Sequence, residues 1–236
     1  MNRFIVVPVI DVRAGQVVHA RRGERERYQP LGSGIARSSA PEDVVDGLLA
    51  LYPFRTLYIA DLDGIVGREP QIGLLQRLRE RAPDTEWWID AGVSDLPALR
   101  SIQAIGTPVL GTESLSAAGA GAILDAAPDA VLSVDFRGER FLGPPELLAS
   151  PHRWPRRLIA MNLERVGSGA GPDLELLARL RSVARRGEIF AAGGARNAED
   201  LRAVAAAGAR GALVASCLHD GRLGRPQIEA IEGESG

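Results

Sequence analysis

The sequence contains no lysine, one cysteine and three histidines, and each scarcity narrows the chemistry open to the chain. Its 28 basic residues are all arginine, which excludes catalysis through a lysine Schiff base. Cys217 has no second cysteine to pair with, which excludes an internal disulfide and fits a reducing cytoplasm. His19, His152 and His219 leave little for a histidine-rich metal site or a Ser–His–Asp triad, so we expect no metal and no organic cofactor.

Long apolar runs and a strong charge of either sign are also missing. The apolar run at residues 5–10 is too short to span a membrane, and it lacks the small-residue cleavage site of a signal peptide. The net charge of −2 gives no reason to expect nucleic acid or an anionic membrane as a partner. We therefore expect a cytoplasmic globular protein that acts on a small molecule; its oligomeric state is left open.

Short apolar β-type runs alternate with amphipathic segments, a pattern typical of βα units and a parallel sheet. The clearest helices begin near Ser, Asp, Asn or Pro, and several end at Gly; they cover residues 38–51, 95–106, 171–187 and 197–208. The expected strands are residues 4–10, 56–60, 86–90, 108–111, 130–135, 157–161, 187–191 and 211–215. Eight such units predict an α/β fold, a (β/α)8 TIM barrel forming one domain over residues 1–236, with a doubly wound open sheet as the main alternative.

The two halves of the sequence repeat one another. "FIVVPVIDVRAGQVV" at residues 4–18 and "DAVLSVDFRGERFL" at residues 129–142 share an apolar strand, an Asp, an apolar residue, an Arg and a turn containing Gly. Three further blocks match in the same order: 57–78 with 158–180, 89–99 with 191–201, and 109–115 with 213–219. We predict a duplicated half-barrel, with halves at about residues 1–125 and 126–236.

The duplication places one carboxylate on each of two opposite walls. Asp11 and Asp135 end the first and fifth expected strands, and active sites of such barrels lie at the carboxyl ends of the strands. Facing carboxylates suit proton transfers on two sides of a small substrate. The alternative is that each Asp caps its turn or pairs with the following Arg13 or Arg137.

Small residues follow the third, fourth, seventh and eighth strands. Glycines at such turns let backbone N–H groups approach an anion, although Gly is also ordinary turn chemistry. We predict one phosphate site from the third and fourth strands and a second from the seventh and eighth. The residues concerned are Gly92, Gly111 and Thr112 in the first half, and Gly193, Gly194, Ala215 and Ser216 in the second.

Seven segments of the chain, including those around Asp11 and Asp135, resemble the histidine-biosynthesis (β/α)8 barrels. This family includes ProFAR isomerase and the imidazole glycerol phosphate synthase cyclase subunit. The similar stretches are "VPVIDVRAGQVV", "DLDGIVG", "VLGTESL", "LSVDFRG", "GPDLELL", "AAGGARNAEDL" and "GALVAS", which cover nearly the whole chain in order. The resemblance implies an Amadori rearrangement, in which an aminoaldose ring opens and C2 loses a proton. It also implies Asp11 as the general base and Asp135 as the general acid or its partner, and it places His19 where the family usually has Arg.

Several positions depart from the family pattern. Met161 stands where the isomerases carry Thr, Val166 replaces an Asp, and Asp90 lies in a run that is usually "GGGI". A carboxylate at position 90 repels phosphate unless an Arg or a proton offsets it. The departures leave three hypotheses: an isomerase of Amadori type, a cyclase or lyase with a glutaminase partner, or a non-catalytic barrel that binds a phosphorylated metabolite. Divergent relatives of the family also occur near pterin- and furan-type one-carbon cofactor pathways.

Two further features have two interpretations each. Asp61 and Asp63 in "DLDG" either bind a divalent cation or accept backbone hydrogen bonds within a loop, and we favour the second. The arginine-rich segment 19–39 is either a solvated surface or a lid over an anionic substrate.

Overall fold

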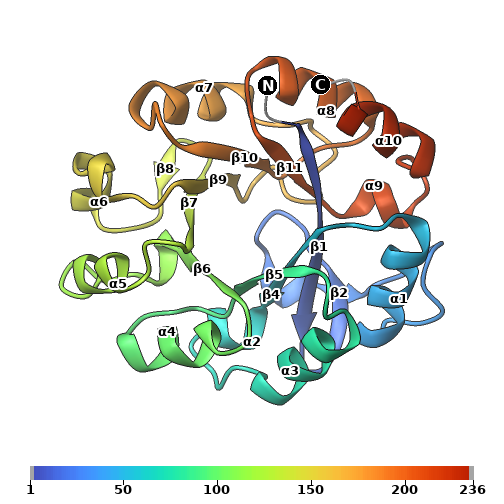
Figure 1. The fold of residues 1–236 in the computed structure, drawn as a ribbon, viewed down its shortest axis with the longest axis horizontal. Helices are drawn as coiled ribbons and strands as arrows, with labels where there is room; N and C mark the ends of the chain where they lie inside the picture. Colours follow the sequence, from blue (N-terminus) through green and yellow to red (C-terminus); the bar gives the residue numbers. More distant parts are fainter. Residues whose placement is uncertain (1–2, 234–236) are drawn as a thin grey trace.

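The computed structural model describes residues 3–233, and its central feature is a closed barrel of eight parallel strands. The barrel closes where the last strand pairs with the first, Ile5 lying opposite Gly211. The prediction of an α/β TIM barrel is therefore confirmed (Figure 1). Its strands are β1 (Ile5–Arg13), β4 (Thr56–Asp61), β5 (Glu86–Asp90), β6 (Thr107–Gly111), β7 (Val131–Arg137), β9 (Arg157–Asn162), β10 (Glu188–Ala192) and β11 (Gly211–Val214).

The helices lie between successive strands and ring the outside of the barrel (Figure 1). Side-chain caps fix several starts, because Asp95, Asp173 and Asn197 each accept a hydrogen bond from a backbone N–H of the first turn. None of the helices in residues 3–233 is long and apolar enough to cross a membrane. The helices are α1 (Pro41–Leu51), α2 (Leu62–Ile65), α3 (Ile72–Arg81), α4 (Leu96–Gln103), α5 (Ala120–Ala126), α6 (Pro145–Ala149), α7 (Leu174–Val183), α8 (Ala198–Ala206), α9 (Ser216–His219) and α10 (Arg225–Gly233).

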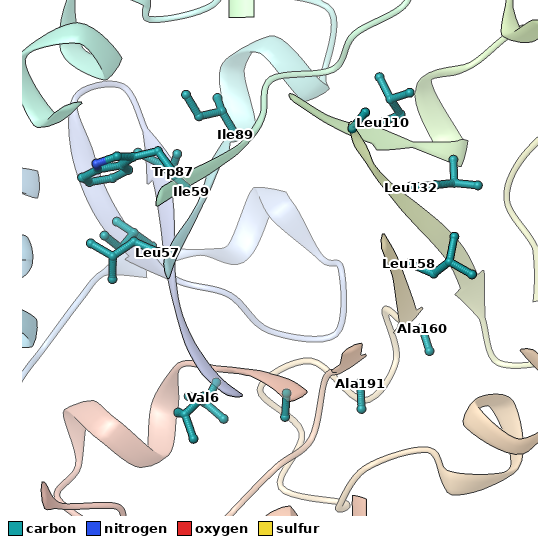
Figure 2. Close-up of a cluster of buried hydrophobic side chains, with 14 of the residues drawn as sticks. Val6, Leu57, Ile59, Trp87, Ile89, Leu110, Leu132, Leu158, Ala160 and Ala191 are labelled. Atoms are coloured by element: carbon teal, nitrogen blue, oxygen red, sulfur yellow. The ribbon is translucent and has the colours of Figure 1, made fainter. Parts of the chain in front are cut away.

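Alternate strand residues bury two separate apolar layers. The outer layer lies between strands and helices; Figure 2 shows its strand side chains, including Leu57, Ile89 and Leu158. The inner layer fills the barrel, where Trp88 packs edge-on against Phe190 with ring centroids 4.8 Å apart. The filled interior leaves room for a ligand at the strand ends, which is the usual arrangement of this architecture.

Strand β1 runs three residues, and β7 two residues, beyond the end expected from the sequence. Each continues past its Asp into a short antiparallel partner, β2 (Gln16–His19) for β1 and β8 (Arg140–Phe141) for β7. The turns need a left-handed backbone, which Gly15 (φ +76°) and Gly138 (φ +58°) supply. The same hairpin thus occurs in both halves, while the half-barrel duplication itself and its boundary near residue 125 stay predictions.

A further short strand, β3 (Gln29–Pro30), pairs with β2, and short 3₁₀ turns lie at η1 (Arg25–Arg27), η2 (Thr112–Ser114) and η3 (Pro151–Arg153).

Candidate active site

A cavity of about 320 Å³ opens at the carboxyl ends of the barrel strands. Most of the residues predicted to form the site line it together: Asp11, His19, Asp135, Gly193, Gly194, Ala215 and Ser216. Gly92, Gly111 and Thr112, the residues predicted to form the first-half phosphate site, are not part of this lining. The cavity therefore combines the two Asp residues with one of the two predicted phosphate turns.

Asp11 and Asp135 lie on opposite walls, since β1 and β7 are four places apart around the eight-stranded barrel. Asp11 is half-buried, and its carboxylate accepts no hydrogen bond from any residue between 3 and 233. Burial raises the pKa of Asp11 to about 7; the Arg25 guanidinium opposes this rise and the Asp90 carboxylate adds to it. The Asp11 carboxylate is thus available to a ligand and changes charge near neutral pH.

Asp135 is held much more tightly. Its Oδ1 accepts a hydrogen bond of 2.6 Å from the Ser133 hydroxyl, and its Oδ2 accepts from the Thr112 hydroxyl at 3.2 Å and from the Glu113 N–H at 3.3 Å. Burial nevertheless raises the pKa of Asp135 to about 8, because it outweighs the Ser133 hydrogen bond and is reinforced by the Glu113 and Asp90 carboxylates. Asp135 is therefore mostly protonated at neutral pH.

Asp90 is a third buried carboxylate at the base of the cavity. Its Oδ1 accepts from the Gly92 N–H at 3.2 Å and its Oδ2 from the Tyr58 hydroxyl at 3.1 Å. Burial raises the pKa of Asp90 to about 6, against the lowering effect of the Gly92 N–H. A Cβ on Gly111 would lie 3.4 Å from an oxygen of both Asp90 and Asp135, so a glycine at position 111 gives the two carboxyl groups room.

The segment between β2 and β3 crosses the cavity mouth and places Arg25 inside it. The Arg25 guanidinium forms an ion pair with Glu113 on the far side, and its backbone carbonyl accepts a hydrogen bond of 2.8 Å from Arg13. The Arg22 N–H donates to the Val166 carbonyl at 2.7 Å, which ties the segment to the loop after β9. Arg25 therefore fits the interpretation of this segment as a lid. Arg21 and Arg22 are exposed and fit the interpretation as a solvated surface.

The turns after β10 and β11 form the opposite side of the cavity. Gly193 (φ +94°) and Gly194 (φ +89°) adopt left-handed conformations, and a Cβ on Gly194 would lie 2.2 Å from the Gly171 carbonyl oxygen. The N–H groups of Gly193, Gly194 and Ala195 donate to no acceptor within residues 3–233. Across the mouth, the Ser216 hydroxyl lies 3.3 Å from His19 Nε2, which places the imidazole over the same turn.

Arginines and apolar residues complete the lining. Arg196 and Arg222 lie at the β10 and β11 side, each paired with an aspartate, Asp200 and Asp220 respectively. Three apolar side chains of β9 and the loop after it form a further wall: Met161, Leu163 and Val166. Met161 and Val166 are positions at which the sequence already departs from the polar family pattern.

Asp61 and Asp63 accept hydrogen bonds within their loop, as in the interpretation favoured from the sequence. Asp61 caps α2 by accepting from the N–H groups of Asp63 and Gly64, and it also accepts from Gln71. Asp63 accepts from the Ala14 N–H at 2.7 Å and pairs with Arg68. Across residues 3–233, no group of three or more His, Cys, Asp or Glu side chains is placed to hold a metal ion.

Sequence reasoning missed Tyr58 and Glu113 as parts of the site. Tyr58 and Ala60 lie two positions apart on β4, so both side chains point to the same side of the strand. That side faces the barrel interior. That parity was readable from the sequence once the strand was placed. Glu113 carried no such signal, because its partner Arg25 is 88 residues away.

Comparison with known proteins agrees with this fold. A family model described as "Histidine biosynthesis protein" matches residues 152–224. The phosphoribosyl-imidazole-4-carboxamide isomerase (ProFAR isomerase) of Myxococcus xanthus is 27% identical, over 93% of this chain and 95% of its own. The same isomerase of Thermomicrobium roseum is 28% identical over 98% and 100%. An uncharacterized protein of Methanocaldococcus jannaschii is 27% identical over 94% and 96%.

Proposed function

We propose that this chain, a divergent relative of the histidine-biosynthesis (β/α)8 barrels, catalyses an aldose–ketose isomerisation of Amadori type on a phosphorylated sugar conjugate. The observation that carries the proposal is the pair of carboxyl groups on opposite walls of one cavity, Asp11 with a pKa of about 7 and Asp135 with a pKa of about 8. An acid and a base whose pKa values bracket the working pH are what such proton transfers need.

The reaction divides into proton transfers that these two groups can perform. Asp135, protonated, donates to the ring oxygen of an N-glycoside as the C1–O bond breaks, which leaves an open chain with a C1=N bond. Asp11, ionised, removes the C2 proton, and the electron pair moves toward nitrogen to form an enaminol. Asp11 then returns its proton to C1 while Asp135 recovers the proton of the C2 hydroxyl. The product is an aminoketose, and both carboxyl groups end in their starting states.

The phosphate of the substrate binds at the turns after β10 and β11. Support comes from the unpartnered N–H groups of Gly193, Gly194 and Ala195 and from the imidazole of His19 beside Ser216. Backbone N–H groups that converge on a cavity are a common anion site. The expected ligand is therefore a small phosphorylated metabolite.

A second candidate function is binding without catalysis. The apolar side chains of Met161 and Val166 favour it, since the isomerases carry polar groups at these positions. The cyclase alternative is weaker, because it needs a carboxylate at position 166 as well as a glutaminase partner.

Hydrogen exchange at C2 tests the isomerase directly, because it reports proton removal whatever the product. The protein is incubated in D2O with ProFAR and, separately, with N-aryl glycosides of ribose 5-phosphate, and C2 deuteration is followed by NMR. We expect exchange with at least one substrate and none with Asp11→Asn. Binding by calorimetry with neither C2 exchange nor formation of the aminoketose would reject the isomerase in favour of the binding protein.

A further inference from the structure

The two pairs of turns that were expected to bind two phosphates correspond in the sequence repeat but differ in hydrogen bonding. In the sequence alignment of the two halves, Asp90 corresponds to Ala192 and Gly92 to Gly194. Both glycines are left-handed, and a Cβ on either would lie within 2.5 Å of a carbonyl oxygen of a neighbouring loop. Gly92 and Gly194 therefore occupy corresponding, crowded left-handed positions, and the hydrogen bonding of their N–H groups can be compared directly.

The N–H groups of the first half are already used. The Gly92 N–H donates to Asp90 Oδ1 at 3.2 Å, and the Glu113 N–H donates to Asp135 Oδ2 at 3.3 Å. The counterpart of Gly92 in the second half, Gly194, donates to no acceptor in the described part of the chain. Internal carboxylates thus occupy in the first half the donors that an external anion would use.

Charge leads to the same conclusion. Asp90 and Glu113 line the cavity at the ends of β5 and β6, and Asp11 and Asp135 line it from β1 and β7. The basic group that reaches them within residues 3–233 is Arg25, and it is paired with Glu113. A second phosphate dianion placed here would meet the Asp90 carboxylate, which is ionised at neutral pH with its pKa of about 6, and no free cation would offset the repulsion. An amine or another N–H donor would instead form charge-assisted hydrogen bonds with the same oxygens.

We infer that the substrate is a monophosphate, with its phosphate at the β10 and β11 turns and an amine or N–H donor, in place of a second phosphate, at Asp90 and its neighbouring carboxyl groups. This inference rests on the proposed function for the location of the phosphate. It separates this chain from ProFAR isomerases, whose name contains two phosphoribosyl groups.

Matched ligand pairs test each end of the substrate by calorimetric titration. Fructose 6-phosphate and fructose 1,6-bisphosphate differ by one phosphate, and glucose 6-phosphate and glucosamine 6-phosphate differ by one amine. We expect the second phosphate to give no gain in affinity and the amine to give about a tenfold gain, the size of one charge-assisted interaction. A bisphosphate that binds tenfold more tightly than its monophosphate would overturn the inference while leaving the isomerase standing.

Variants at position 90 identify the cause. Asp90→Ala makes the first-half turn match Ala192, frees the Gly92 N–H and removes a charge, so the bisphosphate is expected to gain affinity and the amine preference to fall. Asp90→Asn keeps an oxygen for Gly92 and should lose only the amine preference.

Asp125→Asn is the control, because Asp125 is exposed and pairs with Arg153 outside the cavity. Unchanged preferences in both Asp90 variants would contradict the inference, and a protein that binds neither inorganic phosphate nor any of the four sugars would contradict the phosphate site as well.

Discussion

The two walls of the cavity place an aspartate at the same position of the same hairpin, yet the two side chains differ in almost every respect. Asp135 accepts hydrogen bonds from Ser133, Thr112 and the Glu113 N–H, whereas Asp11 accepts none from the described residues and faces Arg25. Hydrogen bonding alone would give Asp135 the lower pKa. The order is reversed, at about 8 against about 7. Burial raises the pKa of both groups; the Glu113 and Asp90 carboxylates add to the rise at Asp135, while the Arg25 guanidinium opposes the rise at Asp11.

This comparison teaches that symmetry of the backbone does not impose symmetry of the chemistry. Asp11 and Asp135 stand at corresponding strand ends, and their neighbours differ: the Arg25 guanidinium opposes the rise in the pKa of Asp11, and the Glu113 carboxylate adds to that of Asp135. Under the proposed function, this difference makes Asp135 the acid and Asp11 the base. One cation and one anion are enough to separate the roles.

The largest expected effect comes from removing either carboxyl group. The wild type should show a bell-shaped pH dependence of kcat/KM, rising as Asp11 ionises near pH 7 and falling as Asp135 ionises near pH 8. Asp11→Asn and Asp135→Asn should each lower kcat by about 10²–10⁴, the usual contribution of a general base or acid. Whatever activity remains should lack the acidic limb in Asp11→Asn and the alkaline limb in Asp135→Asn. The loss of the opposite limb in each variant would reverse the two assignments.

A second comparison uses the corresponding glycines. An Ala at position 92 or 194 takes a left-handed backbone, and its Cβ would meet a carbonyl oxygen at 2.5 Å or 2.2 Å, so both variants should lose about 2–4 kcal/mol of unfolding free energy. Only Gly194→Ala should also weaken the binding of fructose 6-phosphate, by roughly tenfold, because only that turn offers free N–H groups. Gly221→Ala is the control: its φ is +76° but nothing lies within 4 Å of a Cβ there, so about 1 kcal/mol is expected. Equal losses of affinity at positions 92 and 194 would mean that both turns bind phosphate.

Features that depend on neighbouring residues in the chain could be predicted from the sequence, and features that depend on distant residues could not. Strand periodicity and capping residues such as Asn197 predict the eight-stranded barrel, and strand ends locate Asp11 and Asp135 at its mouth. Interactions across the cavity cannot be predicted from any local sequence pattern. The pairing of Arg25 with Glu113 joins two loops through tertiary structure alone.

The first-half phosphate site shows the same limit more sharply. The glycines at positions 92 and 111 predict an anion site, and the sequence also shows Asp90 beside them. Whether its carboxylate turns outward or accepts the Gly92 N–H depends on Tyr58, whose hydroxyl holds the second oxygen from another strand. The placement of that side chain therefore needed the structure.

The smallest expected effect concerns stability and tests whether Asp90 is a cost to the fold. The folded-state pKa of about 6 lies above the ordinary value of 3.8, so between these values the folded protein binds more protons than the unfolded chain. Stability from this group is therefore complete below pH 3.8 and is lost as the pH rises through 6.

Asp90→Asn keeps an oxygen for the Gly92 N–H and removes the charge. It should raise the unfolding free energy by about 2 kcal/mol at pH 8, with the gain disappearing toward pH 4. Urea unfolding across this range measures the difference. A variant less stable than the wild type at pH 8 would mean that the ionised carboxylate stabilises the turn, and that the first half retains Asp90 for the fold rather than for a ligand.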